Sequence, residues 1–411
     1  MNNSYVKIST LIIASIFLFC YRFCCTQTTH TAPPLFHINL DLEPEKRWDD
    51  IIQQIPQYKI LELVNTLQPI FQRIKTIPNL DKLIGSNLLT EEYTQELRGI
   101  VSALEKKIGK KIPILTYENL FLLNITYELF VCCTSGIIVG EEGIPYLFRN
   151  LDWPLFAKTL RKNTIDIEWY KNSSCLFKST GFPFLVGIYT GQRNHTFALS
   201  INSRHEKNGS IAQNIKTYLD DPQNRWAPSI IARHILQYSK SYDDAVSRYK
   251  TCKLISPVFI AIAGTKKEEG IIFARSKNSL VETQTLKNWR EFYPSTKQHS
   301  NPLNDSSPLI TDPAMAKAKY IVISNNDPSQ RTAEIIPSHC SQSPLQKEQI
   351  NNSIGSLYRK NTTLNSCCNL PKDFSPKNLF KKILWINPTG NRLTVYSTVM
   401  CPATNCYESL K

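Results

Sequence analysis

The spacing of apolar residues changes abruptly near Val131, and this change constrains the fold more than any other feature of the sequence. Between about residues 44 and 130, apolar residues recur every three or four positions, which is typical of amphipathic helices. After Val131, short apolar runs alternate with turns that contain Gly or polar residues, which is typical of strands. The sequence therefore predicts a helical N-terminal segment followed by an α+β segment with mostly antiparallel sheets.

Individual elements can be predicted within the second segment. A helical stretch is predicted over 225–252. Two stretches rich in Ser, Asn, Pro and Lys, roughly 291–317 and 340–372, are predicted to be surface insertions. The predicted strands are 135–139, 144–151, 164–170, 182–191, 195–202, 257–264, 270–276, 319–325 and 391–400.

The N-terminus has the features of a secretory signal peptide. Lys7 precedes the apolar run Leu11–Phe19, which is too short to span a bilayer, since a spanning helix needs about 20 residues. We predict a signal peptide over 1–26, a lysosomal or secreted protein, and disulfides among its twelve cysteines. Acceptor tripeptides for N-glycosylation support this address: Asn124, Asn172, Asn194, Asn208, Asn304, Asn351 and Asn361.

The charge balance limits the class of partner. A net charge of +14 fits nucleic acid, an anionic membrane, or simply a solvated surface. A luminal address argues against nucleic acid, so an anionic lipid surface is the favoured partner, and a solvated surface stays the alternative. No cysteine pair has the spacing of a zinc site, so the sequence predicts neither a metal nor another cofactor.

Residues 132–152, CCTSGIIVGEEGIPYLFRNLD, read as a β-hairpin with polar ends. Its turn, GEEG, contains two glycines, so the second strand returns Arg149 and Asp152 to the start of the first strand at Cys133. A guanidinium stabilises a neighbouring thiolate, and a carboxylate can orient an amine or the arginine. The alternative is structural: a disulfide through Cys132 or Cys133, and a surface ion pair between Arg149 and Asp152.

The Cys-Thr-Ser motif at 133–135 and the Arg-Asn-Leu-Asp motif at 149–152 resemble, spacing included, those of the acid ceramidase and N-acylethanolamine acid amidase family. The resemblance implies an αββα sandwich of the N-terminal nucleophile hydrolase type, whose precursor cuts itself before the cysteine. The products would be a helical α segment, 27–132, and a catalytic β segment, 133–411. Four other stretches resemble the family and occur in the same order along the chain as in the family: 33–48, 124–130, 176–192 and 392–400.

The resemblance also implies a role for each site residue. Cys133 is the nucleophile and its new α-amine the general base, while Cys132 only precedes the scissile bond. Arg149 stabilises the thiolate or the substrate oxygen, and Asp152 holds the α-amine. The stretch YIVISNNDPSQRTAE, 320–334, resembles a family motif that implies Asn325 as oxyanion donor and Arg331 as a second arginine.

Two departures from the family pattern bear on activity. Phe148 stands where the family has a glycine, which would add an aromatic wall or crowd the site floor. Ser203, between Asn202 and Arg204, replaces the family's glutamate, so reduced activity is an open alternative.

The implied activity is hydrolysis of long-chain N-acyl amides, with ceramide ranked slightly ahead of N-acylethanolamines. A catalytically weak or silent lipid-binding member of the same fold is the competing interpretation, and amide hydrolysis of the penicillin or bile-salt type is a third. The implied partners are the lipid amide, an anionic membrane surface and a lipid-presenting activator protein. Related ceramidases also suggest a disulfide from Cys24 or Cys25 to Cys340, which requires that signal cleavage leaves Cys24 or Cys25 in the mature chain.

Overall fold

The computed structural model describes residues 30–76, 79–84, 86, 88–125, 132–153, 157–204, 211–221, 225–292, 316, 318–325 and 356–411. The chain divides into two units, 1–32 and 33–411, and all described helices and strands belong to the second. The predicted signal peptide lies outside the described residues, as do Cys24, Cys25 and Cys340, so these predictions stay predictions. No helix in the described part of the chain is both long and apolar enough to cross a bilayer.

Two β-sheets pack face to face. The larger has eight strands in the order β1-β4-β5-β6-β7-β10-β11-β12, and the smaller has five in the order β13-β2-β3-β14-β15. Neighbouring strands in both sheets are antiparallel except β1 and β4. Strands β2, β3 and β14 contact β7 across the interface. The bounds in the larger sheet are β1 Leu35–Asn39, β4 Ile165–Lys171, β5 Ser174–Gly181, β6 Thr190–Arg193, β7 Phe197–Ser203, β10 Val258–Ala263, β11 Gly270–Arg275 and β12 Leu280–Thr285; those in the smaller are β2 Cys132–Val139, β3 Pro145–Asp152, β13 Tyr320–Ile323, β14 Thr394–Cys401 and β15 Cys406–Leu410.

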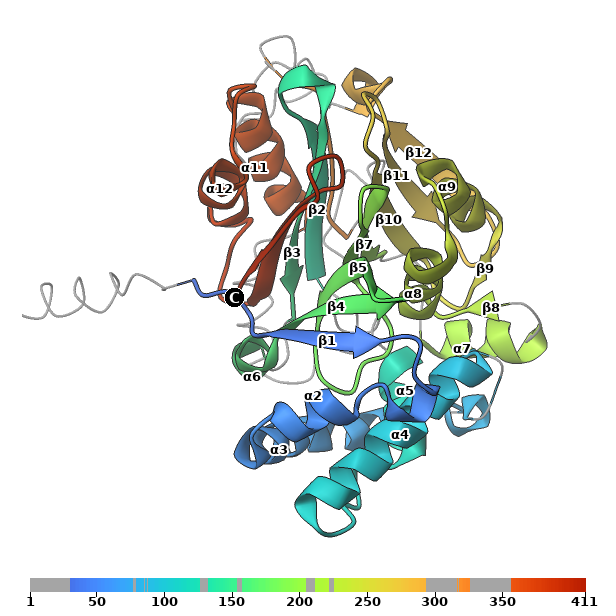
Figure 1. The fold of residues 1–411 in the computed structure, drawn as a ribbon. Coiled ribbons are helices and arrows are strands. Elements are labelled where there is room, and N and C mark those ends of the chain that lie inside the picture. Colours follow the sequence, from blue (N-terminus) through green and yellow to red (C-terminus); the bar gives the residue numbers. More distant parts are fainter. Residues whose placement is uncertain are drawn as a thin grey trace, which may run out of the picture. The chain divides into compact units, whose positions relative to one another are not determined.

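Helices cover the outer face of each sheet (Figure 1). Helices α8 (Pro228–Tyr238) and α9 (Tyr242–Thr251) pack on the larger sheet, and α11 (Ser356–Cys368) packs on β13 and β2 of the smaller one. These four layers confirm the predicted αββα sandwich. The remaining α-helices of the described residues are α2 Asp49–Gln54, α3 Gln57–Lys75, α4 Glu91–Ile108, α5 Tyr117–Ile125, α6 Ala157–Asn163, α7 Ile211–Asp220 and α12 Pro376–Leu379. A two-stranded sheet pairs β8 Arg225–Trp226 with β9 Lys253–Leu254.

Local sequence explains where α4 begins and ends. The Thr90 side chain accepts a hydrogen bond from the Tyr93 N–H, which satisfies a donor that the helix itself cannot. The first turn carries Glu91 and Glu92, whose charges suit the positive end of the helix dipole. Gly109 ends the helix with φ of 75°, a left-handed conformation that glycine adopts without a steric penalty.

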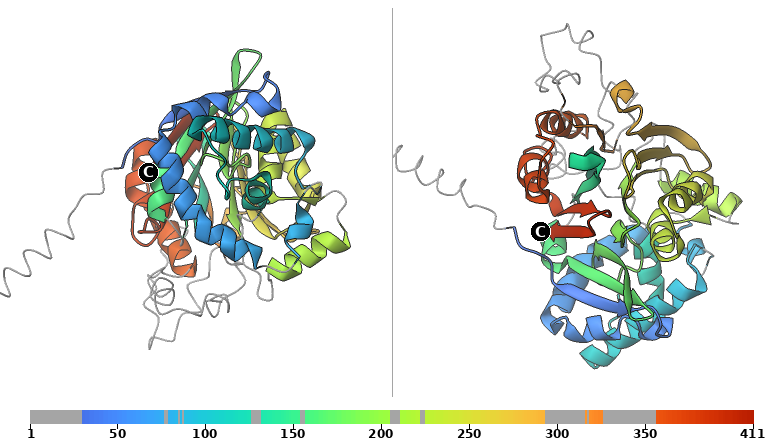
Figure 2. Two further views of the ribbon diagram at one scale, coloured as in Figure 1. Left: turned by 90° about the horizontal axis from the view of Figure 1, so that it is seen from below. Right: turned by 45° about the horizontal axis from the view of Figure 1, so that its top comes forward.

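The α segment is not purely helical. Helices α2–α5 lie together beside β1 and β4 in Figure 1 and stay grouped in both views of Figure 2. However, β1 from this segment pairs in parallel with β4, with Leu35 opposite Asp166 and Asn39 opposite Tyr170. The α segment therefore contributes an edge strand to the larger sheet, and main-chain hydrogen bonds join it to residues beyond the predicted cut.

Two predictions about local structure were wrong. The stretch 182–191 is irregular up to Thr190, with Phe184 at φ of 74°; its apolar side chains are buried without forming a strand. The described end of the 340–372 stretch is not a surface insertion, because α11 buries Thr363 and Cys367 against the smaller sheet. Strands β12 and β15 were missed because edge strands are half-exposed and carry few apolar residues.

Glu96 is buried at the junction of the α segment with α8. Its carboxylate accepts hydrogen bonds from Arg47 at 2.9 Å, from the Trp48 indole at 3.0 Å, and from Arg233 at 2.8 and 3.1 Å. Arg233 comes from the β segment and is also fully buried, under the ring of Trp169 at 3.9 Å. The junction therefore depends on a buried ion pair whose removal on one side would leave the other charge unpaired.

We expect Glu96→Gln to lower the free energy of unfolding by about 3 to 5 kcal/mol, because the fully buried Arg233 loses the carboxylate that it contacts directly. Urea titration measures the loss. Glu62→Gln is the matched control, since the exposed Glu62–Lys162 pair spans the same two segments at 2.9 Å and is expected to contribute below about 1 kcal/mol. Equal losses in the two variants would contradict the assignment.

Asp166 lies largely buried on β4, toward β15. Burial raises the pKa of its carboxyl group to about 6, although Thr180, Ser409 and the lysines Lys411 and Lys178 act in the opposite direction. Folding therefore disfavours the charged form, and stability is highest when Asp166 is protonated. The stabilising effect is present at low pH and is lost as the pH rises through about 6.

Asp166→Asn is expected to remove up to about 3 kcal/mol of the decrease in unfolding free energy that the unchanged protein shows between pH 4 and pH 7. Urea titrations at several pH values measure this difference. Asp220→Asn, which neutralises a carboxylate on the protein surface, is the control for the loss of one negative charge. An unchanged profile in Asp166→Asn would disprove the role of this carboxyl group.

Candidate active site

The β2–β3 hairpin forms as predicted and brings the motif residues together. Cys132 lies opposite Asp152 and Ser135 opposite Arg149 in the antiparallel register. The turn is closed by Gly143 at φ of 81°, a conformation that favours glycine. The distance of sixteen residues between Cys133 and Arg149 is therefore set by the hairpin.

The Arg149 guanidinium points at the Cys133 thiol. Nη2 of Arg149 lies 2.9 Å from Sγ of Cys133, and both side chains are fully buried. Nη1 donates to the carbonyl oxygen of Tyr189 at 2.5 Å and to Oγ1 of Thr190 at 2.6 Å. These two acceptors on the larger sheet fix the guanidinium across the sandwich, so one N–H remains aimed at the sulfur.

A second cluster surrounds the main-chain nitrogen of Cys133. This N–H donates to Oδ1 of Asn325, at the end of β13, over 2.8 Å. Oδ1 of Asn325 also accepts from Nη2 of Arg359 at 2.9 Å, and Nη1 of Arg359 donates to the Asp152 carboxylate at 2.7 Å. Arg359 thus bridges Asn325 and Asp152 beside the peptide bond that the predicted cut would break.

The predicted roles of Asn325 and Asp152 remain predictions, but their contacts are defined. Nδ2 of Asn325 donates to the main-chain oxygen of Ser203 at 2.8 Å, so one of its two N–H groups is already engaged. Asp152 also accepts from Thr394 at 2.7 Å. Burial raises the pKa of Asp152 above its usual value, and the charge of Arg359 and the Thr394 hydroxyl offset only part of that rise. The carboxylate is therefore a stronger base than an exposed aspartate.

The alternative of a surface ion pair between Arg149 and Asp152 is excluded. Both side chains are buried, and each has other partners: Arg149 contacts Thr190 on the larger sheet, while Asp152 contacts Arg359 on α11. Odd and even positions of a strand point to opposite faces of the sheet. The contact between Cys133 and Arg149 therefore lies on one face of the hairpin, and the contact between Asp152 and Arg359 lies on the other.

Arg359 was missed from the sequence, and Arg331 lies outside the described residues. The motif search assigned the second arginine to the residues directly after Asn325, whereas Arg359 follows 34 positions later on α11. Ser356 ties the two elements together, because its hydroxyl accepts from the Asn325 N–H at 2.9 Å. A usable signal existed: Leu357, Leu364 and Cys368 are seven and four residues apart, which is helical spacing.

The two departures from the family pattern have little direct effect on these contacts. Phe148 packs against Gly136, where an added Cβ would meet its ring at 2.3 Å, on the face of the hairpin opposite Arg149. The ring of Phe148 therefore lies on the other face of the hairpin from the Cys133 thiol, and its effect on activity stays a prediction. Ser203 contacts Asn325 through its main-chain oxygen, which any residue at that position provides.

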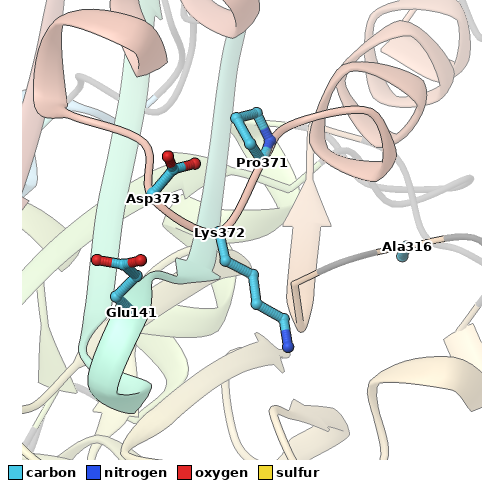
Figure 3. A pocket seen from close by; sticks show the side chains of 5 residues that line it. All are labelled: Glu141, Ala316, Pro371, Lys372 and Asp373. Carbon is cyan, nitrogen blue, oxygen red and sulfur yellow. The ribbon is translucent and has the colours of Figure 1, made fainter.

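A separate pocket lies near the tip of the hairpin (Figure 3). It has a volume of about 440 Å³ and is lined by Glu141, Ala316, Pro371, Lys372 and Asp373. The length of β2 separates this tip from Cys133 by roughly 20 Å, so the pocket is distinct from the thiol site. Within the described ranges, no group of three or more His, Cys, Asp and Glu side chains is arranged to hold a metal ion.

An αββα sandwich with a buried thiol at the start of a central strand and a guanidinium against it is the architecture of N-terminal nucleophile hydrolases. Residues 31–108 match the family model described as the beta subunit of N-acylethanolamine-hydrolyzing acid amidase. Acid ceramidase of Mus musculus is 30% identical over 278 residues, which cover 63% of this chain and 68% of that protein. The chain therefore belongs to the acid ceramidase and N-acylethanolamine acid amidase family, whose members are amide hydrolases.

The chain is also similar to an amidase of another organism and to a solved structure. The N-acylethanolamine-hydrolyzing acid amidase of Rattus norvegicus is 29% identical over 276 residues, covering 63% of this chain and 68% of that protein. The solved structure of the Caenorhabditis elegans ortholog of N-acylethanolamine-hydrolyzing acid amidase is 24% identical, with a TM-score of 0.46. That alignment covers 66% of this chain and 93% of the other.

We expect Arg359→Lys to lower turnover of an amide substrate by about 10² to 10³, since lysine keeps the charge but cannot bridge Asn325 and Asp152 with two nitrogens. Steady-state rates measure this. The exposed Arg392 provides a control, because Arg392→Lys should retain full activity. If Arg331→Lys abolished turnover while Arg359→Lys preserved it, the sequence-based choice of Arg331 would be right.

Proposed function

We propose that this chain hydrolyses the amide bond of long-chain N-acyl amides, either ceramide or N-acylethanolamines, after cutting itself between Cys132 and Cys133. One observation carries the proposal: the buried Cys133 thiol lies 2.9 Å from Arg149, at a point where a cut would turn its own nitrogen into a free amine. Family membership supports the substrate class.

Self-cleavage requires only groups near Cys133. Its Sγ attacks the carbonyl carbon of residue 132, and the bond from that carbon to the Cys133 nitrogen breaks as the nitrogen takes up a proton. Water then hydrolyses the thioester, which leaves a carboxylate on Cys132 and a free α-amine and thiol on Cys133. The hydrogen bond from the Cys133 nitrogen to Asn325 holds the scissile peptide in place before the cut.

Substrate turnover repeats this chemistry on an external amide. The α-amine, with an ordinary pKa of about 7.7 to 8.0, takes the proton from the thiol, and the thiolate attacks the acyl carbonyl. Arg149 stabilises the thiolate, and an N–H of Asn325 stabilises the oxyanion. The departing amine takes the proton back, and water releases the fatty acid from the thioester. Asp152 and Arg359 keep the α-amine and Asn325 oriented.

A secretory or lysosomal location fits this substrate. The predicted signal peptide over 1–26 and the acceptor tripeptides support it. Asn172 is exposed, whereas Asn124 and Asn361 are buried, so neither of these two accepts a glycan in the folded protein. The net charge of +14 favours an anionic lipid surface as the source of substrate, and a lipid-presenting activator protein is a second partner.

The competing function is a catalytically weak or silent lipid-binding protein. It is favoured by one observation, Ser203 in place of the family's glutamate. Incubation at acidic pH followed by a reducing gel separates the two functions, because a silent protein stays in one piece. Turnover of ceramide and of N-palmitoylethanolamine by one preparation then decides between the two enzyme substrates.

Cys133→Ala is expected to abolish both self-cleavage and hydrolysis, because nucleophile and base belong to the same residue. Gel electrophoresis follows the cut, and fatty-acid release follows hydrolysis. Cys132→Ala is the matched control and should hydrolyse substrate normally once cut. Equal loss in both variants would instead indicate a structural role for the cysteine pair and would disprove the assignment.

A further inference from the structure

A belt of hydroxyl groups lies between the two sheets behind Arg149. Oγ1 of Thr190, which accepts from Arg149, lies 3.0 Å from the hydroxyl of Tyr396. The Tyr396 hydroxyl donates in turn to the main-chain oxygen of Thr180 at 3.3 Å. All three residues are at most 1% exposed. They come from β6, β14 and β5, so the belt spans both sheets of the sandwich.

The number of hydroxyl protons determines which group donates in each hydrogen bond of the belt. Tyr396 has a single hydroxyl proton, which goes to the Thr180 carbonyl. Either hydroxyl can be the donor in the 3.0 Å contact between Thr190 and Tyr396, and with the Tyr396 proton on the Thr180 carbonyl the donor is Thr190, whose lone pairs then serve Arg149. Hydrogen bonds aligned in one direction polarise one another, so the Tyr396 hydroxyl strengthens the acceptor that Arg149 uses.

The far end of the belt is anchored on a carboxylate. The Thr180 hydroxyl donates to the Asp166 carboxylate at 2.6 Å. The hydroxyl oxygens of Ser409 and Tyr407 lie 2.6 and 2.8 Å from Oγ1 of Thr180. Thr180 has one proton and gives it to Asp166, so Ser409 and Tyr407 act as donors. Thr180 is therefore held at two points. Its carbonyl oxygen accepts the hydrogen bond from Tyr396, and its hydroxyl group contacts Asp166, Ser409 and Tyr407.

We propose that Tyr396 and Thr190 are positioning residues for the reaction: through their hydroxyl groups they hold the Arg149 guanidinium in line with the Cys133 thiol. This inference rests on the proposed function of Cys133 as nucleophile. Thr190 contacts Arg149 directly, and Tyr396 acts on Arg149 through Thr190. The ring of Tyr396 lies 5.9 Å from the guanidinium carbon, so the hydroxyl and the ring make separate contributions.

The test separates the hydroxyl from the ring. Tyr396→Phe keeps the ring and removes one oxygen, and we expect kcat per self-cleaved chain to fall about tenfold with KM within about twofold. Tyr249→Phe is the control, because Tyr249 is equally buried and its hydroxyl has no hydrogen-bond partner among the described residues. A purely structural effect would reduce the amount of cleaved protein and leave kcat per cleaved chain unchanged.

A second pair of variants covers the case in which Tyr396→Phe fails to fold. Thr190→Ser retains the hydroxyl acceptor and should keep at least about half of kcat, whereas Thr190→Val should lose about tenfold or more. Equal kcat in these two variants, or in Tyr396→Phe and the unchanged protein, overturns the proposal.

A readout independent of the substrate distinguishes this proposal from the proposed function. The rate of Cys133 alkylation by iodoacetamide, followed by mass spectrometry of its peptide, should fall about threefold or more in Tyr396→Phe, since a displaced guanidinium stabilises the thiolate less. If alkylation depends on Tyr396 but no N-acyl amide is turned over, the positioning role stands and the proposed function fails. If the unchanged protein hydrolyses the amide, and neither kcat nor the alkylation rate changes in Tyr396→Phe, the positioning role is wrong and the proposed function stands.

Discussion

Arg149 carries a full positive charge into the space between two sheets, where a charge without partners would be far too costly to bury. Its guanidinium is accommodated because the carbonyl oxygen of Tyr189 and the hydroxyl of Thr190 accept two of its hydrogen bonds. Its other terminal nitrogen, Nη2, lies 2.9 Å from the Cys133 sulfur. The same contacts that make the charge tolerable therefore also aim it, and the chemistry of the site depends on this one buried group.

The α segment is held to the sandwich by two different kinds of interaction. Strand β1 adds main-chain hydrogen bonds to the edge of the larger sheet, and Glu96 adds a buried ion pair with Arg233. Neither depends on the peptide bond before Cys133 being intact. A chain that cuts itself at that bond would therefore keep its helical segment in place, as a two-segment enzyme requires.

Three distant stretches of sequence meet at the Cys133 nitrogen. The hairpin supplies Asp152, the end of β13 supplies Asn325, and α11 supplies Arg359, which contacts both. Ser356 joins α11 to β13, so Asn325 and Arg359 are positioned together. Arg149 and this second cluster approach Cys133 from different faces of one hairpin. The thiol and the main-chain nitrogen of Cys133 thus have separate sets of partners.

The sequence by itself determined the parts of this protein that depend on local periodicity and short spacing. The switch from helical to strand periodicity, the β2–β3 hairpin and the pairing of Cys133 with Arg149 all follow from residues within about twenty positions of one another. The tertiary structure alone decided what long-range contacts bring together: β1 as an edge strand, Arg359 as an arginine that bridges Asn325 and Asp152, and the belt through Tyr396. Such contacts leave no periodic trace, because a single side chain reaching across a sheet obeys no spacing rule in its own segment.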